Sequence, residues 1–480
     1  MANDGAVTLL HEVTERTLPV ARIEPVIGTE RFGRLIAAAD RLRTRLAART
    51  IWNISSVAVG GGVAEMLQVI VGYVAGFDIP IRWTVIGADP AFFGITKRLH
   101  NHIHGADSDD MPISVADTRY YEQVLAANAD ELLTQIKPGD VALLHDPQTA
   151  GLTSALAQAG ARVVWRCHIG IDNQNDIARA AWDFLRPYLA AAQGYVFTRR
   201  QYVPLWVPRA RTWIIPPSID PLSAKNAWID PDTVRAILTT IGVYEQTGSG
   251  QRGLYPRNDG TKAEVIRTAL VTGDGRPGPG DPVVVQVSRW DTLKDMAGVM
   301  RGFAEDVLPC SDGYLILAGP AMTGVADDPE GAKVFTDCLN QWHALSARAR
   351  ERVLLVALPL DDFEENAAMV NAIQRRATVI VQKSLAEGFG LTVAEGMWKG
   401  RPVIGSAVGG IVDQVAEGTG ILLPDPTDLA MFGAQVCRLL DNPDEADRMG
   451  KAGQAYTREH FVGDLHLLRF AELMEAVITD

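Results

Sequence analysis

The fold of this chain follows from one stretch, Lys383-Ser-Leu-Ala-Glu-Gly-Phe-Gly-Leu-Thr-Val-Ala-Glu-Gly-Met-Trp-Lys-Gly-Arg-Pro-Val-Ile-Gly-Ser406. A β-branched run over 378–381 leads into it, a polar turn with glycines opens a helical segment, and a second strand follows over 402–406. A strand, a turn, a helix and a strand in this order form a βαβ unit. Sheets built from such units bind ligands at the carboxyl ends of their strands, so we expect a ligand site at this turn.

Two carboxylates lie in this unit, Glu387 in the turn and Glu395 in the helical segment. Gly388 and Gly390 let backbone amides approach a ligand closely, and the helix start beyond them favours an anion. Two acidic residues eight positions apart are ordinarily charges on a helix surface. The glycines and the flanking strands favour instead two carboxylates that face one crevice.

The composition is that of a soluble globular protein with more than one domain. The chain has 480 residues, of which 47% are hydrophobic and 21% charged, and domains usually have roughly 100–200 residues, so we expect two or three. The formal net charge of −13 argues against nucleic-acid partners and against anionic membrane surfaces. A phosphate-binding site must then be a local feature.

The cysteines and the N-terminus favour a cytoplasmic location. The four cysteines are widely scattered without metal-binding spacing, so we expect reduced thiols in a reducing compartment; they are Cys167, Cys310, Cys338 and Cys437. Residues 1–17 lack the basic start and apolar core of a secretory signal. No apolar run reaches the roughly 18 residues of a membrane span, so no membrane partner is expected.

The first part of the chain alternates strands with helices and is predicted to form a domain over residues 1–212, with a parallel sheet covered on both faces. Its first strong strand, 49–56, runs through a glycine triplet at 60–62 into a helix whose apolar residues share one face. Glycines are common in turns in any case. We expect Gly61 and Gly62 to bring a phosphate or a sugar hydroxyl close to that helix start.

A second alternating domain is predicted over 213–460, after a proline-rich hinge that begins at 213. Within it, residues 245–281 are rich in Gly, Pro, Arg, Asp and Thr, and we predict a surface insertion with a short helix at 263–270. The last segment, 461–480, contains a helix over 465–478.

Arg289 and Lys294 follow the first strand of the second domain. Arginine offers a planar fork to phosphate oxygens, and the lysine adds a point charge. Two cations five residues apart are more often a solvated pair, but their place at a strand end favours a diphosphate site.

The first domain has its own polar cluster at strand ends. His168 ends one strand, with Asp172 shortly after it, and Asp146 and Gln148 follow the preceding strand. A lone histidine is more often structural, and the aspartate and glutamine could simply cap strand ends. We interpret the cluster as the site of the acceptor, and we place Asn53, in the first strand, with it.

These motifs resemble retaining glycosyltransferases with two Rossmann-like domains that face each other across a cleft, the GT-B fold. In that family the first glutamate of a Glu-x7-Glu signature holds hydroxyls of the transferred sugar and the second holds the nucleotide ribose, which match Glu387 and Glu395. The resemblance implies that Arg289 and Lys294 grip the donor diphosphate and that His168 lies beside the sugar. It also places Gly388, Phe389, Gly390 and Leu391 on the donor and implies a C-terminal helix that crosses back to the first domain.

The first domain is similar to a narrower family, the trehalose synthases of the glycosyltransferring type. The segments that carry this resemblance are Trp52-Asn-Ile-Ser-Ser56, Ala58-Val-Gly-Gly-Gly-Val-Ala-Glu-Met-Leu67, Gly87-Ala-Asp-Pro-Ala-Phe-Phe-Gly-Ile-Thr-Lys97, His145-Asp-Pro-Gln148 and Trp165-Arg-Cys-His168. The resemblance covers about 49–475 and implies transfer of glucose from a nucleoside-diphosphate glucose to free glucose, giving α,α-trehalose. The 245–281 insertion is longer than expected for that family.

Two other functions compete with this hypothesis. A trehalose phosphorylase would share the motifs but place inorganic phosphate where the donor diphosphate lies, and a non-catalytic protein would only sense the sugar nucleotide. Glu395 favours the transferase, because a ribose contact has no purpose in a phosphorylase. No Asp-x-Asp motif stands at a strand end, so no metal is required, although Mg²⁺ could assist a diphosphate. We expect a homodimer.

Overall fold

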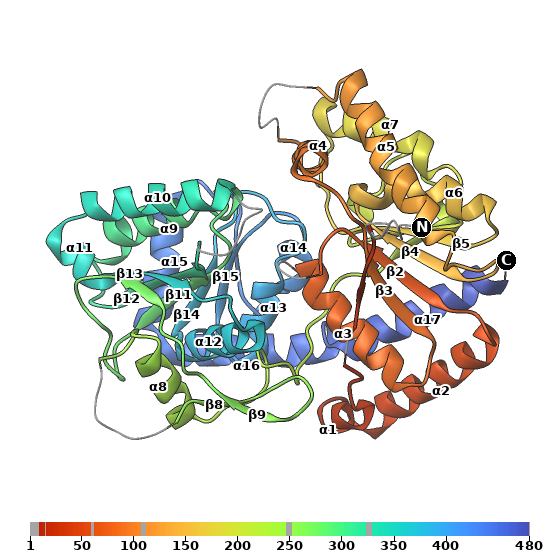
Figure 1. The fold of residues 1–480 in the computed structure, drawn as a ribbon. Coiled ribbons are helices and arrows are strands. Elements are labelled where there is room, and N and C mark those ends of the chain that lie inside the picture. Colours follow the sequence, from red (N-terminus) through yellow and green to blue (C-terminus); the bar gives the residue numbers. More distant parts are fainter. Residues whose placement is uncertain are drawn as a thin grey trace, which may run out of the picture. The chain divides into compact units, whose positions relative to one another are not determined.

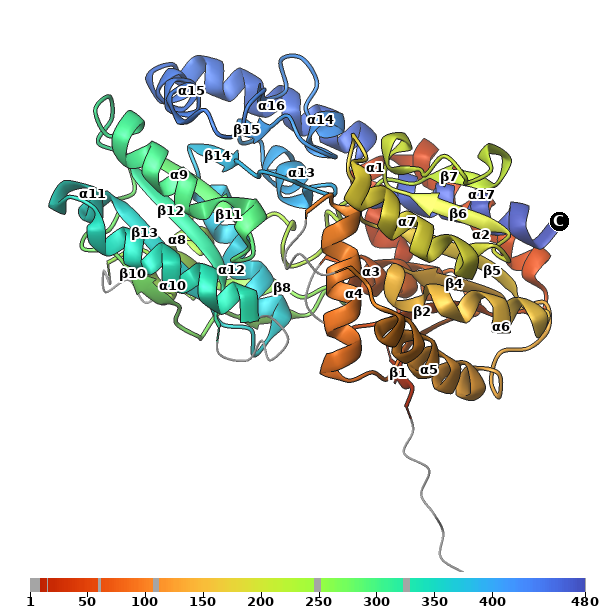
Figure 2. The same ribbon diagram turned by 90° about the horizontal axis from the view of Figure 1, so that it is seen from above.

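The chain forms two compact units, each built on a seven-stranded sheet (Figures 1 and 2). The computed structural model describes residues 9–14, 16–58, 62–106, 112–245, 252–322 and 329–479. Unit 1 comprises Met1–Pro217 and Asp464–Asp480, and unit 2 comprises Ser218–Gly463. In these described ranges no helix is both long enough and apolar enough to span a bilayer. The predicted class, α/β with two Rossmann-like sheets, is confirmed.

The sheet of unit 1 has the order β1-β3-β2-β4-β5-β6-β7. All neighbouring strands are parallel except β1, which pairs antiparallel with β3. The strands are β1 His11–Val13, β2 Ile51–Ser55, β3 Ile81–Val85, β4 Val141–His145, β5 Arg162–Cys167, β6 Gly194–Phe197 and β7 Thr212–Ile214. β2 and β4 are buried along their whole length, as apolar runs between two helical layers must be.

Helices cover both faces of this sheet. Figure 1 shows α4 to α7 on one face and α2, α3 and α17 on the other. The main core of the unit lies under the first group and includes Trp52, Trp165 and Trp182. The helices are α1 Glu24–Ile27, α2 Thr29–Leu46, α3 Gly62–Gly76, α4 Pro90–Ile103, α5 Val115–Leu132, α6 Thr153–Gln158, α7 Asp176–Leu189 and α17 Gly463–Thr479.

The sheet of unit 2 has the order β10-β13-β12-β11-β14-β15-β16. Its neighbouring strands are parallel except β10, which pairs antiparallel with β13. The strands are β10 Leu270–Thr272, β11 Val283–Val287, β12 Tyr314–Pro320, β13 Val353–Leu358, β14 Val379–Gln382, β15 Val403–Ser406 and β16 Ile421–Leu423. Two apolar cores, one on each face, hold this sheet between helices. The helices are α8 Pro231–Thr240, α9 Met296–Gly302, α10 Pro329–Ala344, α11 Ala347–Arg352, α12 Phe363–Arg376, α13 Leu391–Trp398, α14 Ile411–Gln414, α15 Leu429–Asp441 and α16 Pro443–His460.

Each sheet contains one point where the direction of winding reverses. In unit 1 the chain moves from β2 to β3 on one side, and β4 then starts the other side next to β2. In unit 2 the same reversal lies between β11 and β14. Ligands of open α/β sheets bind at such switch points, beyond the carboxyl ends of the strands. The candidate site is therefore sought after β2 and β4 in unit 1 and after β11 and β14 in unit 2.

The prediction for residues 245–281 is wrong. In place of a helix at 263–270 the chain forms a hairpin, β8 Leu254–Pro256 with β9 Lys262–Glu264, and then adds β10 to the edge of the sheet. Tyr255 and Val265 are buried in the core of unit 2, so the segment is not a surface insertion. The backbone N–H groups of Ile266 and Arg267 both donate to the carboxylate of Glu365, at 2.8 Å each, in place of helical carbonyls.

The C-terminal helix α17 belongs to unit 1, which confirms the prediction that it returns to the first domain. At its start, the carboxylate of Asp464 accepts two hydrogen bonds from Arg31 on α2, at 2.6 and 2.8 Å. Two residues further, the ring of His466 lies 3.0 Å from the guanidinium of Arg166, a buried residue of β5. The helix is thus anchored to the first unit by polar contacts as well as by packing.

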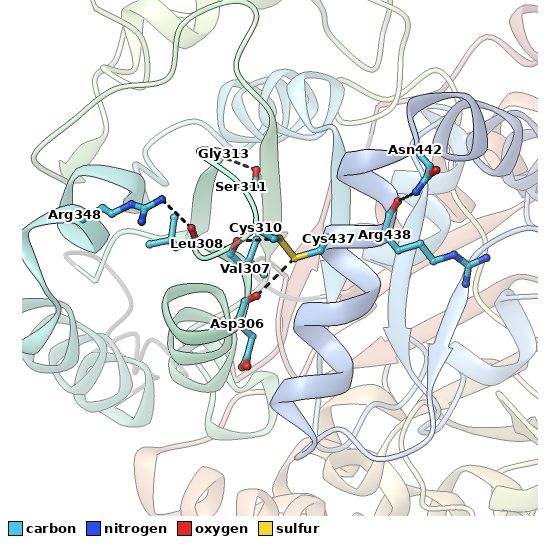
Figure 3. The surroundings of a disulfide bond; sticks show 10 residues. All are labelled: Asp306, Val307, Leu308, Cys310, Ser311, Gly313, Arg348, Cys437, Arg438 and Asn442. Carbon is cyan, nitrogen blue, oxygen red and sulfur yellow. Dashed lines mark hydrogen bonds between the residues drawn. A yellow bond between two sulfur atoms is a disulfide. The ribbon is translucent and has the colours of Figure 1, made fainter.

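Two of the four cysteines form a disulfide, so the prediction that all are reduced thiols is wrong for Cys310 and Cys437 (Figure 3). The bond joins the segment after the π-helical turn Phe303–Val307 to helix α15, and the two Cα atoms lie 6.3 Å apart. The partners are 127 residues apart in sequence. Only the folded chain brings them together, so their spacing gave no signal. Cys167 and Cys338 are free and buried.

Candidate functional site

The loops that follow β11 and β14 are held side by side in unit 2. The side chain of Gln286, near the end of β11, donates to the carbonyl of Lys294 at 2.7 Å and accepts from the amide of Lys383 at 3.1 Å. A second bond joins the loops directly: the backbone amide of Leu385 donates to the carbonyl of Leu293 at 2.8 Å. One buried glutamine and one backbone bridge therefore fix the two loops against each other at the switch point.

These loops bring two predicted residues into direct contact. The ammonium of Lys294 lies 2.7 Å from Oε2 of Glu387, and each side chain is only about one-eighth exposed. The hydroxyl of Ser384 also donates to Oε2 of Glu387, at 3.3 Å. The carboxylate is thus positioned by a cation and a hydroxyl in a partly water-excluded place, where an ion pair is stronger than on an open surface.

Arg289 lies in the same loop but makes much weaker contacts. Its guanidinium is half exposed and approaches the carboxylate of Asp291 at 3.3 Å. Trp290, next to it, is buried and donates its indole N–H to the carbonyl of Pro320 at 2.8 Å. The buried tryptophan anchors the loop, so the guanidinium of Arg289 is available to an anionic ligand at the end of β11.

The glycine turn after β14 opens helix α13. Gly390 has φ 83°, a left-handed conformation that suits glycine, and it precedes the first residue of the helix, Leu391. A Cβ atom at Gly390 would lie 3.1 Å from the side chain of Glu387, so the turn leaves little room for any other residue. Phe389 is buried and packs edge-on against Phe461, with ring centroids 5.9 Å apart. Phe389 can therefore contact a bound donor only through its backbone, as can Gly388.

Glu395 is buried on helix α13 and has partners of its own. Its carboxylate accepts from the amide of Gln374 at 3.3 Å and lies 3.7 Å from the ammonium of Lys225. The buried Lys399 bonds to the carbonyl of Glu395 at 3.3 Å, and burial lowers the pKa of Lys399 to about 7. Glu387 is held by Lys294 and Glu395 by a separate polar group, and the expectation that the two glutamates face one crevice stays a prediction.

In unit 1, the side chains of Asn53, His145 and His168 form a row across β2, β4 and the end of β5. Nδ1 of His145 lies 3.0 Å from Nε2 of His168, and Nε2 of His145 lies 3.2 Å from Oδ1 of Asn53. The two imidazole rings are nearly parallel, 11° apart. Asn53 is wholly buried. Its side chain orients His145, and its contact with an acceptor stays a prediction.

Both histidines are neutral at physiological pH. Burial lowers the pKa of His145 to about 3, and burial together with the charge of Arg166 holds the pKa of His168 well below its usual range. The side-chain oxygen of Asn53 faces Nε2 of His145, so it accepts a hydrogen bond from Nε2–H. Nδ1 of the neutral His145 must then accept from Nε2–H of His168, which leaves Nδ1 of His168 as a hydrogen-bond acceptor.

Asp146 holds the backbone of His168, and its own backbone is strained. Its carboxylate accepts from the His168 amide at 2.8 Å, and its own backbone has φ 63° and ψ 177°, a region that non-glycine residues rarely enter. Such strain is found mainly at functional sites. Burial raises the pKa of Asp146 to about 7, although the amide of His168 and the charge of Arg166 act in the opposite direction.

The remaining acceptor residues are placed differently. Gln148 is half-buried, and its carbonyl oxygen is buried with no hydrogen-bond partner among the described residues. Asp172 forms an ion pair with the buried Arg199 and is one-third exposed. Gly62 is the first residue of α3, and Gly61 lies outside the described residues. Gln148 thus has hydrogen-bonding capacity to offer a ligand, whereas Asp172 is already paired.

Sequence reasoning missed several polar residues around these groups. His145 appeared only as part of a motif, although it connects Asn53 to His168. Arg166 and Lys225 were not singled out at all. An arginine inside an otherwise apolar strand is a signal that could have revealed Arg166, because a buried guanidinium needs partners. Nothing near Lys225 in the sequence points to Glu395. No cluster of three or more metal-ligating side chains occurs within the described part of the chain.

Two α/β units, each with a largely parallel sheet and polar side chains at its switch point, fit the GT-B class of glycosyltransferases. Two family models agree: "Glycosyl transferases group 1" matches residues 363–456, and "Trehalose synthase, N-terminal domain" matches residues 53–204. A trehalose synthase of Rubrobacter xylanophilus is 32% identical over 95% of this chain and 96% of its own length. One of Pyrococcus horikoshii is 30% identical over 98% of this chain and 100% of its own length. The chain belongs to the trehalose synthase family.

More distant relatives share the fold and parts of the sequence. A trehalose phosphorylase of Grifola frondosa is 23% identical over 90% of this chain, which corresponds to 57% of that protein. Among solved structures, a UDP-forming α,α-trehalose-phosphate synthase of Burkholderia xenovorans superposes with a TM-score of 0.66 at 14% identity, over 90% of this chain and 100% of that one. The structural likeness shows a shared fold, and the sequence relatives support trehalose-related glycosyl transfer.

Proposed function

We propose that this protein transfers glucose from a nucleoside-diphosphate glucose to free glucose, releasing the nucleoside diphosphate and forming α,α-trehalose with retained anomeric configuration. The observation that carries the proposal is the contact between Lys294 and Glu387, 2.7 Å apart at the switch point of unit 2. A cation for the leaving group and a carboxylate for sugar hydroxyls are the two groups that such a transfer needs most. Membership of the trehalose synthase family supports the same reaction.

On the donor side, Arg289 and Lys294 would hold the diphosphate. Lys294 is neutralised by Glu387 in the free protein, so an incoming diphosphate competes for the ammonium and frees the carboxylate to accept hydroxyls of the glucosyl group. The amides of Gly388 to Leu391, at the start of α13, favour negative charge there. Glu395 would hold the ribose hydroxyls, in exchange for its contacts with Lys225 and Gln374.

On the acceptor side, His168 would present an unprotonated ring nitrogen to a sugar hydroxyl, with His145 and Asn53 behind it. Asp146 fixes the position of His168 through its backbone, and Gln148 offers the oxygen that has no partner within the described residues. As charge develops on the leaving diphosphate, the cations stabilise it while the acceptor hydroxyl attacks the same face of the sugar. Asp172 would contribute only after its ion pair with Arg199 opens.

The experiment that tests the proposal is a product assay. The purified protein is incubated with glucose and with UDP-, ADP- or GDP-glucose in turn, and disaccharide and free nucleotide are quantified. Trehalose and nucleoside diphosphate in equal amounts support the proposal and identify the base. Release of nucleotide without a disaccharide, or no turnover with any donor, contradicts it.

A retaining trehalose phosphorylase is the second candidate, and the similarity to the Grifola frondosa enzyme favours it. Inorganic phosphate would then occupy the place of the diphosphate beside Arg289 and Lys294. Trehalose incubated with phosphate and no nucleotide distinguishes the two: glucose and glucose phosphate would form only in the phosphorylase. The homodimer and the cytoplasmic location stay predictions, as does the absence of a metal requirement.

A further inference from the structure

A cavity lined by several arginines lies in unit 2, and the proposed transfer does not use it. It has a volume of about 450 Å³, within the range of small-molecule sites. Four arginines line it, and they are joined by two aromatic side chains, Trp228 and Tyr244, and by a few apolar residues. We refer to this cavity as the arginine pocket; its arginines are Arg235, Arg375, Arg376 and Arg401.

The arginine pocket lies at the opposite edge of the sheet from Lys294 and Glu387. Arg375 and Arg376 end helix α12 just before β14, and Arg401 stands just before β15. These are the amino ends of strands whose carboxyl ends carry the candidate donor site. The four residues of β14 span roughly 13 Å at about 3.3 Å per residue, so the two places are distinct.

Neutral acceptors hold each of the three inner guanidinium groups in place. Arg375 donates to Oδ1 of Asn371 at 2.9 Å and to the carbonyl of Ala227 at 3.0 Å. Arg376 donates to the carbonyls of Gly278 and Asp281, at 2.9 and 2.6 Å, and to the hydroxyl of Tyr244. Arg401 donates to the carbonyl of Arg375. These bonds fix the guanidinium groups but leave their charges uncompensated.

Among the four arginines, the exposed Arg235 at the rim has a carboxylate partner within the described residues, Asp232 at 3.9 Å. Within the described residues the partners of Arg375, Arg376 and Arg401 are neutral oxygens, and the lining contains no acidic residue. Glu245, directly after Tyr244, is exposed and is not part of the lining. Nε of Arg401 is buried and has no hydrogen-bond partner among the described residues.

The crowding of these cations is itself unfavourable. Burial, with the charge of Arg401, lowers the pKa of Arg375 to about 10, and burial with the charge of Arg376 lowers the pKa of Arg401. Burying like charges without a counter-ion is unfavourable, and a bound anion would offset this by neutralising them. A protein with a net charge of −13 has ample carboxylates, yet within the described residues none pairs with Arg375, Arg376 or Arg401. The arrangement is that of a phosphate site, which arginines bind through paired hydrogen bonds.

The remaining wall of the pocket indicates more than an inorganic ion. Trp228 is 73% exposed, unusual for a tryptophan, and Tyr244 is buried beneath the guanidinium of Arg376, 5.9 Å from its ring centroid. Exposed aromatic faces bind planar rings and the C–H faces of sugars. We propose that the arginine pocket binds a phosphorylated small molecule, whose phosphate contacts Arg376 and Arg401 and whose organic part rests on Trp228.

The test is isothermal titration calorimetry of the full chain with AMP and, separately, with inorganic pyrophosphate. Both probes carry phosphate, but only AMP has a planar ring. The titrations are made in an Arg289→Gln/Lys294→Gln background, so that the proposed donor site does not contribute. We expect one AMP per chain, with affinity roughly tenfold lower after Arg401→Gln because one charged hydrogen-bonding group is lost. Trp228→Ala should weaken AMP but leave pyrophosphate unchanged.

Arg401→Gln could impair folding, since Arg401 is largely buried, so Arg235→Gln provides an independent variant at the exposed rim of the pocket. It should weaken both probes severalfold. Arg438→Gln on α15 is the matched control, because Arg438 and Arg235 have the same exposure, 52%. It should change neither affinity. Equal AMP affinity in the Arg235→Gln, Trp228→Ala and Arg438→Gln proteins, or no AMP binding at all, overturns the proposal. Since the donor residues are removed, neither result bears on the transfer reaction.

Discussion

The ammonium of Lys294 and the carboxylate of Glu387 lie 2.7 Å apart although 93 residues separate them in sequence. The contact follows from the order of the strands. β11 and β14 are neighbours because the sheet reverses its winding between them, and the two residues stand in the loops that follow these strands. Gln286 then holds the loops together from below. The pair is thus a product of topology, and it is where we expect the reaction to be most sensitive to mutation.

Removing either charge of this pair should lower the turnover number by about 10²–10³-fold, the usual cost of losing one group that stabilises developing charge. The changes are Glu387→Gln and Lys294→Met, which keep the approximate size of each side chain. Steady-state kinetics in the product assay measure the effect, and circular dichroism checks that the fold is retained.

The control for this pair is Lys451→Met, which breaks an exposed ion pair with Asp447 on α16. Exposed pairs contribute little, about 0–1 kcal/mol, so activity and stability should remain near those of the parent protein. Near-normal turnover of either Glu387→Gln or Lys294→Met would show that the pair is structural.

Glu395→Gln should affect the binding of a nucleotide donor and spare the chemical step. Losing one charge-assisted hydrogen bond to the ribose raises KM for the donor by roughly tenfold, with a smaller change in kcat. Trehalose breakdown with phosphate, if the protein catalyses it, would be unaffected because phosphate has no ribose. The measurement is a comparison of KM and kcat for nucleotide-sugar and phosphate reactions.

A matched control for Glu395 is Glu365→Gln, because Glu365 is equally buried and forms an ion pair with Arg267 elsewhere in unit 2. It should lower thermal stability without changing KM. If both variants raise KM alike, the effect of Glu395 is a general loss of structure and its ribose contact is refuted.

The central parallel strands of both sheets could be predicted from the sequence, because a strand buried on both faces is an apolar run between glycine-rich turns. The strand predicted over 49–56 contains β2, Ile51–Ser55. The short edge strands could not be predicted in this way. β1 and β10 have three residues each and are defined by their antiparallel partners, β3 and β13. The helix expected at 263–270 failed for the same reason, since long-range pairing and the contacts of Glu365 decide that segment.

The candidate site could be predicted as single residues but not as contacts. Motifs identified Lys294 and Glu387 separately, and only the strand order brings them together. Asn53 shows the same limit: its place near other polar residues was predicted, but its contact with His145 inside the buried sheet was not. Lys225 reaches Glu395 from a segment 170 positions away in sequence, the difference of the two residue numbers, so no local pattern could reveal it.

The buried polar row in unit 1 should make the stability of that unit depend on pH. His145, His168 and His466 have pKa values lowered by burial, so in the pH range between the lowered values and about 6.5 the unfolded chain binds protons that the folded chain does not. Their contribution is fully present above about pH 6.5 and is lost as the pH falls. Asp146 acts in the opposite sense, because its pKa is raised to about 7 and the folded state keeps its proton.

Two substitutions separate these effects. Between about pH 5 and 6, His145→Gln should flatten the increase of unfolding free energy with pH by about 1.4 kcal/mol per pH unit, and Asp146→Asn should steepen it by a similar amount. Urea unfolding followed by the fluorescence of the tryptophans in unit 1 measures the slopes. Slopes that change in the same direction in both variants would contradict the assigned protonation states.

The disulfide between Cys310 and Cys437 should stabilise unit 2 through the unfolded chain, because it closes a long loop between residues that are 127 positions apart. Loss of such a crosslink typically costs about 2–4 kcal/mol, so a reductant should lower the melting temperature of the parent protein, and Cys437→Ser should have the same lower melting temperature with or without reductant.

Cys338→Ser is the control: Cys338 is a free buried thiol, so its replacement weakens packing but leaves the response to reductant in place. Differential scanning calorimetry of the three proteins under both conditions makes the comparison. A reductant that shifts Cys437→Ser as far as the parent protein would mean that the bond does not form in solution, and the sequence-based expectation of four reduced thiols would then be restored.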